Sequence, residues 1–267
     1  MTTISIVVPS LNQDQYIEAC LRSILSQDHS STQLIVVDGQ STDNTLDVLR
    51  RYEDQISHLI VEPDQGQADA LRKGFALATG DIQCYLNSDD YLLPGTLAFV
   101  ADYFSRHRSI DALYSNRIVV NATDEVIDCW ILPRHSNYLM ERWDYIPQET
   151  CFWRRTTFDR SDGIDAELEF AMDYDLFIQL MRAGRMVHVQ KFLAAFRDHD
   201  QSKTHTLNDT VGKREVSKLQ DRYGITLRPH DRLIGGLLRR MVEYRSHRYL
   251  SNHGHSLLQR IQASSES

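Results

Sequence analysis

The sequence predicts an α/β fold in which a mostly parallel central sheet is flanked by helices. Short apolar runs rich in β-branched residues alternate with amphipathic stretches over the N-terminal part of the chain. The apolar runs are continuous, which is typical of strands buried on both faces. Each run ends in a polar turn before the next helix, and such a β-α-β alternation favours parallel strands joined by crossover helices. The length of 267 residues is enough for one large domain or two fused lobes.

The N-terminal part is expected to contain four strands separated by three helices. The first helix follows the Ser10 turn and carries Ile17, Cys20, Leu21 and Ile24 on one face, as helical periodicity requires. The expected strands are residues 4–9, 34–38, 56–61 and 81–86, and the expected helices are residues 13–27, a segment starting near residue 46, and residues 68–78.

The pattern changes after a further helix that starts at Pro94 and runs to about His107. Short strands separated by turns are expected next, followed by an irregular aromatic segment, residues 132–147. The expected strands are residues 112–114, 118–120, 126–131, 149–154 and 186–196, with helices at 171–183, in the tail from 208, and at 231–250.

Composition excludes several classes of protein. The net charge of −8 argues against a nucleic-acid-binding protein. The four cysteines are far apart and lack metal-ligand spacing, so a reducing cytosol is expected. We also expect no signal peptide, because Met1 is followed by no basic region, and no spanning helix, because no apolar run approaches the roughly 20 residues that a bilayer requires.

Two adjacent carboxylates follow the fourth expected strand, in the segment Asn87-Ser88-Asp89-Asp90. The carboxyl ends of parallel strands are the usual ligand site of open α/β sheets. Neighbouring carboxylates repel each other unless a cation or a proton lies between them, and a hard divalent cation with a phosphate ligand is one solution. A polar turn before a Pro-initiated helix is the alternative.

Asp38, at the end of the second expected strand, lies where dinucleotide-binding folds place a ribose-binding carboxylate. The first turn, Ser10 to Asp14, however, lacks the Gly-x-Gly-x-x-Gly pattern that a pyrophosphate requires. The residues therefore favour a metal-chelated nucleoside diphosphate over NAD.

An ordered set of segments resembles the family 2 glycosyltransferases. The set runs densely through the first hundred or so residues and more thinly from 145 to 205. Its members are Ile6-Val7-Val8-Pro9, Asn12, Tyr16, Leu21-Arg22-Ser23-Ile24, Asp38-Gly39-Gln40-Ser41-Thr42-Asp43, Gly66-Gln67-Ala68-Asp69-Ala70, Gly74, Ala78-Thr79-Gly80-Asp81 and Leu86-Asn87-Ser88-Asp89-Asp90.

The resemblance implies a GT-A fold with a C-terminal helical extension and an inverting, non-processive transfer of a sugar from a nucleotide-sugar donor, with UDP the usual nucleotide. It implies that Asp38 contacts the base and that the Asp89-Asp90 pair is the metal motif, in which Asp89 lies toward the ribose and Asp90 ligates Mn²⁺ or Mg²⁺ on the diphosphate. Asp173 would be the catalytic base and His199 a further metal ligand. The remaining implied contacts are Pro9, Asn12 and Gln67 with the donor, and Gln148 and Glu149 with the acceptor.

The sequence departs from the family pattern at three places. Gly39 follows Asp38 where many members have a second Asp, the metal motif reads Asn-Ser-Asp-Asp, and no Glu precedes Asp173. The Gln-x-x-Arg-Trp motif of processive members is absent from the sequence. A synthase that extrudes its polymer through a membrane is therefore disfavoured.

By this interpretation residues 1–110 form the donor-binding half, 111–205 the acceptor-binding and catalytic half, and 206–267 the helical extension. The expected acceptor is a glycan or a lipid-linked oligosaccharide, in the cytoplasm or at the inner face of the cell membrane. The helix at 231–250 is basic and amphipathic, which suits a membrane surface or a helix packed on its own protein. A sugar-phosphate nucleotidyltransferase and a non-catalytic nucleotide- or carbohydrate-binding relative are the alternatives.

Overall fold

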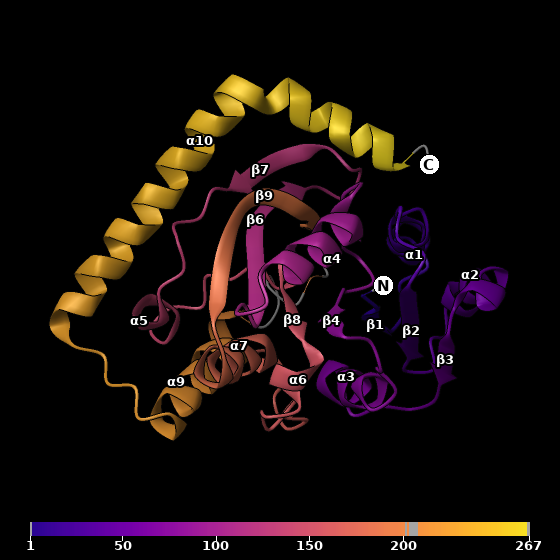
Figure 1. Cartoon of the computed structure of the whole chain (residues 1–267), viewed down its shortest axis with the longest axis horizontal. Coiled ribbons are helices and arrows are strands. Elements are labelled where there is room, and N and C mark those ends of the chain that lie inside the picture. Colours follow the sequence, from indigo (N-terminus) through magenta and orange to yellow (C-terminus); the bar gives the residue numbers. More distant parts are fainter. Residues whose placement is uncertain (1, 201, 203–207, 266–267) are drawn as a thin grey trace.

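The computed structural model describes residues 2–200, 202 and 208–265. In this part of the chain one continuous sheet runs through the molecule in the order β3-β2-β1-β4-β8-β6-β9-β5, with β7 beside β6 (Figure 1). The strands are β1 (Ile4–Ser10), β2 (Thr32–Asp38), β3 (His58–Val61), β4 (Ile82–Tyr85), β5 (Tyr91–Leu92), β6 (Ala112–Val120), β7 (Val126–Trp130), β8 (Phe152–Arg154) and β9 (Met186–Arg197).

Helices cover the sheet and extend beyond it at the C-terminal end. The α-helices are α1 (Ile17–Leu25), α2 (Thr45–Arg51), α3 (Gln67–Phe75), α4 (Thr96–Arg106), α5 (Asn137–Met140), α6 (Arg155–Phe158), α7 (Met172–Ala183), α9 (Lys213–Arg222) and α10 (Pro229–Ser265). Shorter helical turns are η1 (Glu53–Gln55), η2 (Gln148–Thr150) and η3 (Asn208–Gly212).

The N-terminal half of the sheet is parallel, as predicted. β1 lies between β2 and β4, and the register places Ser10 beside Asp38. The backbone N–H of Leu86 donates to the carbonyl of Val7 at 3.0 Å, which extends the pairing of β4 with β1. All residues of β1 are buried because helices cover both faces. The polar turns after these strands therefore meet at one edge of the sheet.

The C-terminal half of the sheet is mixed. β8 is antiparallel to both β4 and β6, whereas β9 runs parallel to β6. β9 also pairs antiparallel with β5, the short strand directly after Asp90. The predicted α/β class is thus confirmed, and the segment with the paired carboxylates is joined to both halves of the molecule.

Three predicted elements differ from the structure in number or type. Residues 112–120 form one strand rather than two, because buried polar side chains in its middle find partners: Asn116 Oδ1 accepts a hydrogen bond from the backbone N–H of Leu132 at 2.9 Å. The strand expected at 149–154 is replaced by the η2 turn and the shorter β8. The aromatic segment at 132–147 contains the short helix α5.

The C-terminal helix α10 is longer than the predicted residues 231–250 and lies along the outer edge of the molecule (Figure 1). Its inner face packs on β7, where Ser246 Oγ accepts a hydrogen bond from the backbone N–H of Ile131 at 3.0 Å. Within the described residues, no helix combines the length and apolar character that crossing a bilayer requires. All four cysteines are buried as free thiols, and Cys20 and Cys84 belong to the main core, as expected.

Candidate active site

A first cavity of about 320 Å³ lies where the carboxyl ends of β1 and β4 meet. We call it the strand-end cavity. Because parallel strands bring their following loops together at one edge, side chains from distant parts of the sequence line the same hollow. Its lining comprises Pro9, Ser10, Leu11, Gln13, Asp64, Gly66, Gln67, Ala70, Asn87, Ser88, Asp89, Phe196 and Ser202.

A second, wider cavity of about 620 Å³ opens between the middle of the sheet and the helices α7 and α9. We call it the central cavity. Its walls combine carboxylates with aromatic rings, a combination that suits a ligand with both hydroxyl groups and an apolar face. The principal lining residues are Tyr85, Asp90, Arg117, Trp130, Arg142, Trp143, Asp144, Tyr145, Gln148, Glu149, Phe170, Asp173 and Phe196.

The two cavities are neighbours, with three residues lining both: Gln67, Asn87 and Phe196. The side-chain amide of Gln67 donates to Asn87 Oδ1 at 2.6 Å, which fixes this shared wall. Asp89 lines the strand-end cavity and Asp90 lines the central cavity. The paired carboxylates therefore lie at the boundary between the two cavities.

Asp90 has the features of a cation ligand. Its side chain is only 1% exposed; Oδ1 accepts from the backbone N–H of Arg197 at 2.9 Å, and Oδ2 has no hydrogen-bond partner among the described residues. Desolvation, with the negative charges of Asp89 and Glu149, raises the pKa of Asp90 well above its ordinary value. A buried carboxylate with one unused oxygen is stabilised by a bound cation, so these residues fit a divalent metal.

His199 lies beside this pair, as the sequence interpretation expects. Its Nε2 is 3.0 Å from Asp89 Oδ2, and its ring packs against Tyr16 with the centroids 4.9 Å apart. Within the described residues, no three His, Cys, Asp or Glu side chains are arranged to hold a metal by themselves. A metal here would need oxygen ligands from a bound phosphate in addition to the protein.

The other three residues expected at the donor differ in position. Pro9 lines the strand-end cavity, but Asn12 and Asp38 do not. Asn12 Oδ1 accepts from the backbone N–H of Thr42 at 2.8 Å, which ties the loops after β1 and β2 together. Asp38 is fully buried, and both its oxygens accept from Ser41 at 2.7 Å. In the structure Asp38 caps this loop, and its contact with a nucleotide base stays a prediction.

Asp173 lies in the first turn of α7 and faces the central cavity. Its Oδ1 accepts from the backbone N–H of Tyr174 at 2.8 Å. Desolvation is the main cause that raises the pKa of Asp173 to about 6, against the lowering effect of the backbone hydrogen bonds. A carboxylate of this pKa is ionised at neutral pH and is still basic enough to accept a proton. Asp175, two residues further on, does not line this cavity and accepts hydrogen bonds from Gln179 and Tyr223.

The turn before Asp173 is held by a residue from α9. The buried Glu215 carboxylate accepts hydrogen bonds from three consecutive backbone N–H groups, those of Glu169, Phe170 and Ala171, each at 2.9 Å. A carboxylate at a helix N-terminus satisfies donors that have no partner within the helix. The C-terminal extension thus fixes the start of the helix that carries Asp173, and no local sequence pattern indicates it.

Gln148 and Glu149 lie in the wall of the central cavity, on the η2 turn. The Gln148 amide donates to the Tyr85 carbonyl at 2.8 Å, and its Oε1 has no partner in the described part of the chain. Glu149 forms a two-bond ion pair with Arg117, at 2.8 and 2.5 Å. The Arg117 guanidinium lies between the rings of Trp130 and Phe196, 4.6 and 4.5 Å from their centroids.

Sequence reasoning missed Asp64, Arg117 and Asp144. Asp64 lines the strand-end cavity after β3, and the rule that identified the end of β4 applies equally to the end of β3. Arg117 was hidden in a segment interpreted as a turn between two strands. Asp144 lines the central cavity from the aromatic segment, where no periodic pattern predicts a side-chain direction.

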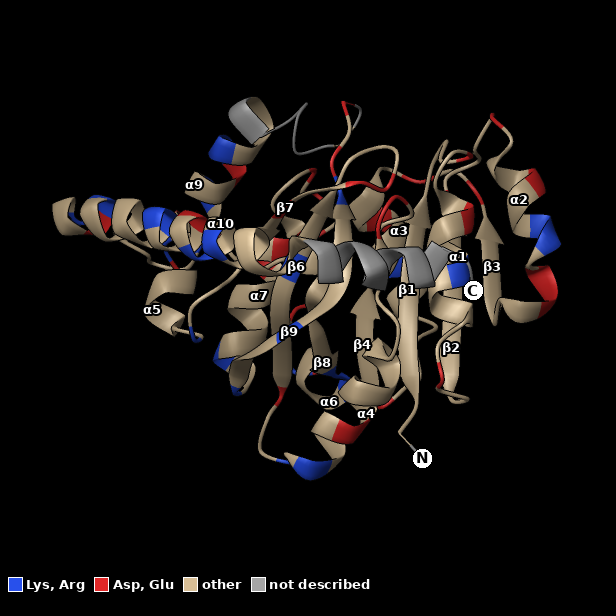
Figure 2. Cartoon of the chain, turned by 90° about the horizontal axis from the view of Figure 1, so that it is seen from above, with Lys and Arg blue, Asp and Glu red and all other residues tan. Residues whose placement is uncertain are grey.

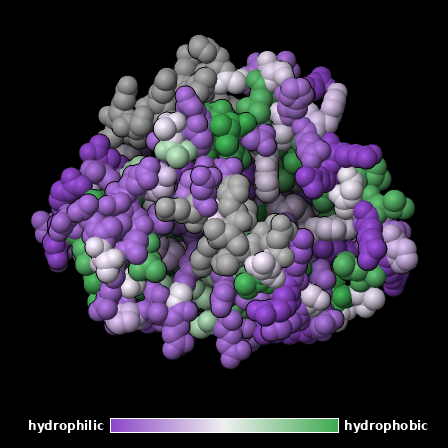
Figure 3. Space-filling model, turned by 180° about the vertical axis from the view of Figure 1, so that it is seen from behind, coloured by the Kyte–Doolittle hydropathy of each residue, from purple (hydrophilic) through white to green (hydrophobic). Residues whose placement is uncertain are grey.

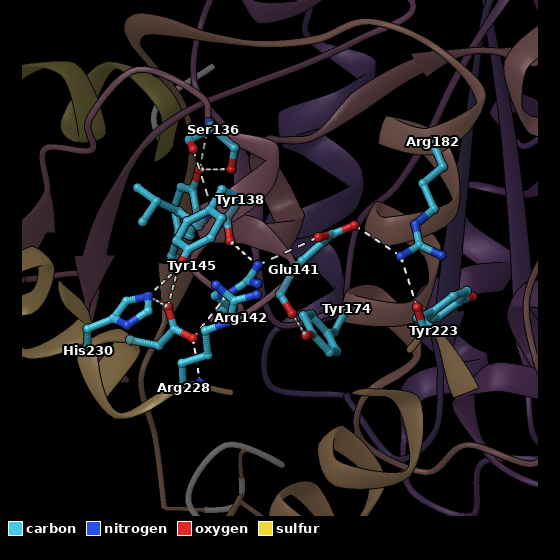
Figure 4. A network of polar contacts seen from close by, with 12 residues as sticks. Ser136, Tyr138, Glu141, Arg142, Tyr145, Tyr174, Arg182, Tyr223, Arg228 and His230 are labelled. Carbon is cyan, nitrogen blue, oxygen red and sulfur yellow. Dashed lines mark hydrogen bonds and ion pairs between the residues drawn. The ribbon is translucent and has the colours of Figure 1, made fainter. Parts of the chain in front are cut away.

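A polar network ties the aromatic segment to the C-terminal helices (Figure 4). Asp231, at the start of α10, is buried; it accepts a hydrogen bond from the Tyr138 hydroxyl and one from the backbone N–H of Arg228 at 2.7 Å. Arg142 Nε lies 3.3 Å from the Asp231 carboxylate, and the Arg142 guanidinium stacks on Tyr138. Since Arg142 lines the central cavity, α10 supports one of its walls.

Comparison with known proteins gives a family match that spans most of the sheet. The profile described as Glycosyl transferase family 2 matches residues 5–163. An uncharacterized glycosyltransferase of Nostoc sp. is 30% identical over 226 residues, which cover 80% of this chain and 70% of that protein.

Two solved structures are similar in fold. S. aureus TarS in complex with UDP-GlcNAc superposes with a TM-score of 0.63 at 20% identity, covering 75% of this chain and 60% of that one. The Pyrobaculum calidifontis mannosyltransferase PcManGT, in complex with GDP-Man and Mn²⁺, gives a TM-score of 0.63 at 16% identity and covers 98% of this chain and 74% of that one.

Proposed function

The chain belongs to glycosyl transferase family 2 and has the GT-A fold, and we propose that it transfers one sugar, with inversion, from a nucleoside-diphosphate sugar to a hydroxyl group of a saccharide. One observation carries the proposal. The strand-end cavity and the central cavity meet at Asp89 and Asp90, so that a donor in the first presents its sugar to an acceptor in the second.

The donor is a UDP-sugar in this proposal, held in the strand-end cavity. Pro9, Gln67 and Asp89 line that cavity, and Asp64 adds a carboxylate that the sequence interpretation did not include. Support for uridine comes from TarS, which was solved with UDP-GlcNAc, whereas PcManGT was solved with GDP-Man. Thermal shifts with different nucleoside diphosphates therefore decide the identity of the nucleotide base.

Mn²⁺ or Mg²⁺ fits the boundary between the two cavities. Asp90 offers a buried oxygen without a partner, and Asp89 and His199 lie next to it. The presence of Mn²⁺ in the PcManGT complex supports a metal of this kind. When bound, such a cation supplies Lewis-acid stabilisation of the negative charge that develops on the leaving diphosphate.

Asp173 is the proposed general base. The acceptor hydroxyl is a poor nucleophile until its proton is removed, and a positioned carboxylate contributes about 10²–10⁴-fold to such a step. Asp173 accepts that proton as the hydroxyl oxygen attacks the anomeric carbon and the bond to the diphosphate breaks, and one such displacement inverts the anomeric centre. The Arg117–Glu149 pair keeps one of the cavity's carboxylates neutralised.

The acceptor occupies the central cavity in this proposal. Gln148 Oε1, which has no partner among the described residues, is available to accept a hydrogen bond from a sugar hydroxyl; Asp144 lines the same cavity, and Trp143 and Tyr145 offer apolar surface. A glycan or a lipid-linked oligosaccharide fits these groups. We infer that the protein acts in the cytoplasm at the inner face of the membrane, which it contacts through the outward face of α10.

The first test is a set of thermal shifts with UDP, GDP, dTDP, CDP and NAD, each with Mn²⁺ and with EDTA. A ligand present at 100 times its dissociation constant adds about 2.7 kcal/mol of stability. We expect UDP to stabilise the protein only when Mn²⁺ is present. Stabilisation by GDP would reassign the base, and stabilisation by NAD without metal would contradict the proposal. The comparisons give no support to a nucleotidyltransferase or to a non-catalytic relative.

A further inference from the structure

The outward face of α10 carries strongly exposed apolar side chains. The three most exposed large hydrophobic side chains all lie on it: Leu233 at 71%, Leu237 at 66% and Tyr244 at 65%, compared with 51% for Leu11, the next in order. Met241, 38% exposed, lies beside them. Residues at spacings of four and seven lie along one side of a helix, so these side chains form a stripe.

This stripe points outward because α10 is fixed to the protein by its other face. Asp231, Gly235 and Ser246 lie on that inner face. Asp231 binds Tyr138, Gly235 packs against the Trp143 ring, and Ser246 accepts a hydrogen bond from the backbone N–H of Ile131, directly after β7. The interpretation of this segment as a helix packed on its own protein therefore applies to the inner face. The side chains of the outer face are exposed in the part of the chain that the structure describes.

Arginines surround the stripe, although the protein as a whole carries a net charge of −8. The segment from Asp231 to Leu250 contains five arginines and two acidic residues (Figure 2). Arg239 pairs with Glu243 at 2.9 Å, and Arg245 is half-buried with Nη1 donating to the Leu132 carbonyl. The remaining three, which form no ion pair with any described residue, are Arg232, Arg240 and Arg248.

The position of Arg240 separates this surface from an ordinary apolar contact. Arg240 is three residues after Leu237 and four before Tyr244, so it lies within the stripe itself. An apolar protein partner would have to desolvate this charge, which is costly without a matching acid. At a lipid surface, by contrast, the leucines and the tyrosine enter the interface while the arginines stay among the headgroups.

We propose that the outward face of α10 docks the protein on an anionic phospholipid surface, with Leu233, Leu237 and Tyr244 inserted and Arg232, Arg240 and Arg248 in contact with headgroup phosphates. This docking would be the membrane contact of the proposed function, and it does not depend on the transfer reaction. The face seen in Figure 3 provides a contrast, since hydrophobic residues lie there in small groups among hydrophilic ones.

The test is co-sedimentation of the full chain with vesicles of phosphatidylcholine alone and with vesicles that also contain phosphatidylglycerol. We expect binding to the second kind, weakened by salt. Each arginine near an anionic surface is worth about fivefold in binding, so the triple change Arg232→Gln, Arg240→Gln and Arg248→Gln should lower partitioning on the order of 100-fold. The triple change Leu233→Ser, Leu237→Ser and Tyr244→Ser should abolish it.

The control is Val61→Ser with Leu77→Ser, which removes exposed apolar groups outside α10 and should bind vesicles as the wild type does. UDP-dependent thermal shifts measured on every variant separate a folding or donor-site defect from a docking defect. Equal partitioning of the wild type and both α10 variants would overturn the proposal. So would a concentration-dependent dimer, seen by light scattering and lost in the leucine variant, without any vesicle binding.

Discussion

The two halves of the candidate site are built in different ways. The strand-end cavity is formed mainly by the segments that follow β1, β3 and β4, with Phe196 and Ser202 completing its lining, so its position depends chiefly on the parallel part of the sheet. The central cavity depends on segments far away in the sequence: Glu215 of α9 caps the turn before Asp173, and Asp231 of α10 holds the aromatic segment. A change in the C-terminal helices should therefore affect the acceptor half and leave donor binding intact.

Asp90→Asn should have the largest effect, because it removes the proposed metal ligand at the junction of the two halves. Loss of a metal contact worth several kcal/mol corresponds to a fall in transfer rate of about 10³-fold or more. The fold should survive, since burial already raises the pKa of Asp90 and Asn retains an acceptor for the Arg197 N–H. The measurement is transfer activity together with the Mn²⁺-dependent thermal shift by UDP.

Asp102→Asn is the matched control for this change, since Asp102 lies on the exposed surface of α4 and pairs with Arg106. It should leave both measurements unchanged. Full activity in the Asp90 variant would remove the metal from the proposed mechanism.

Asp173→Asn tests the acceptor half alone. We expect transfer to fall by about 10²–10⁴-fold, while UDP with Mn²⁺ still stabilises the protein. A general base must be ionised, so wild-type kcat/KM should be constant above a pH of about 6 and fall as the pH drops through that value. The residual activity of the variant should lack this dependence. If UDP binding were lost instead, Asp173 would belong to the donor site.

Glu215→Ala should impair the central cavity and leave the strand-end cavity unchanged, although Glu215 lines neither of them. Three backbone N–H groups lose their acceptor, and an unsatisfied buried donor costs about 1–3 kcal/mol. We expect a lower Tm and a transfer rate lowered about 10–100-fold through misplacement of Asp173, with UDP binding retained at temperatures where the protein is folded.

Glu215→Gln keeps one acceptor oxygen and should lie between the wild type and the alanine variant. Glu167→Gln, at an exposed position on the loop before α7, is the control. An unchanged rate in the alanine variant would show that the N-terminus of α7 needs no support from α9.

The difference between the two halves of the site also explains which of its residues can be predicted from the sequence. Strand ends can be found from local patterns, and Asp89 and Asp90 do lie in the loop after β4, one in each cavity. Pro9 and Gln67, which the family resemblance nominates, line the strand-end cavity, and their contact with a donor stays a prediction. Arg117 and Glu215 could not be predicted, because their partners are 32 residues away or more. A buried ion pair or a distant cap leaves no periodic pattern in the sequence. Asp38 shows the converse, since its place at a strand end predicts a nucleotide contact, whereas in the structure both of its carboxylate oxygens accept hydrogen bonds from Ser41.

The smallest expected effect comes from two adjacent glycines of α10. A Cβ at Gly235 would lie 2.6 Å from Trp143 Nε1, whereas a Cβ at Gly236 would meet nothing within 4 Å. Alanine at position 236 should therefore stabilise the protein by about 0.5–1 kcal/mol through helix propensity. Alanine at position 235 gains the same propensity but displaces the Trp143 ring, and overpacking costs about 1–3 kcal/mol.

Because both substitutions add one methyl group to the same turn, their difference isolates the contact between α10 and the wall of the central cavity. We expect Gly235→Ala to be less stable than Gly236→Ala in urea, to shift tryptophan emission, and to weaken binding of a saccharide acceptor more than binding of UDP with Mn²⁺. Identical stability and emission in the two variants would mean that Trp143 moves aside freely. The central cavity would then depend on the Asp231 network alone for its attachment to α10.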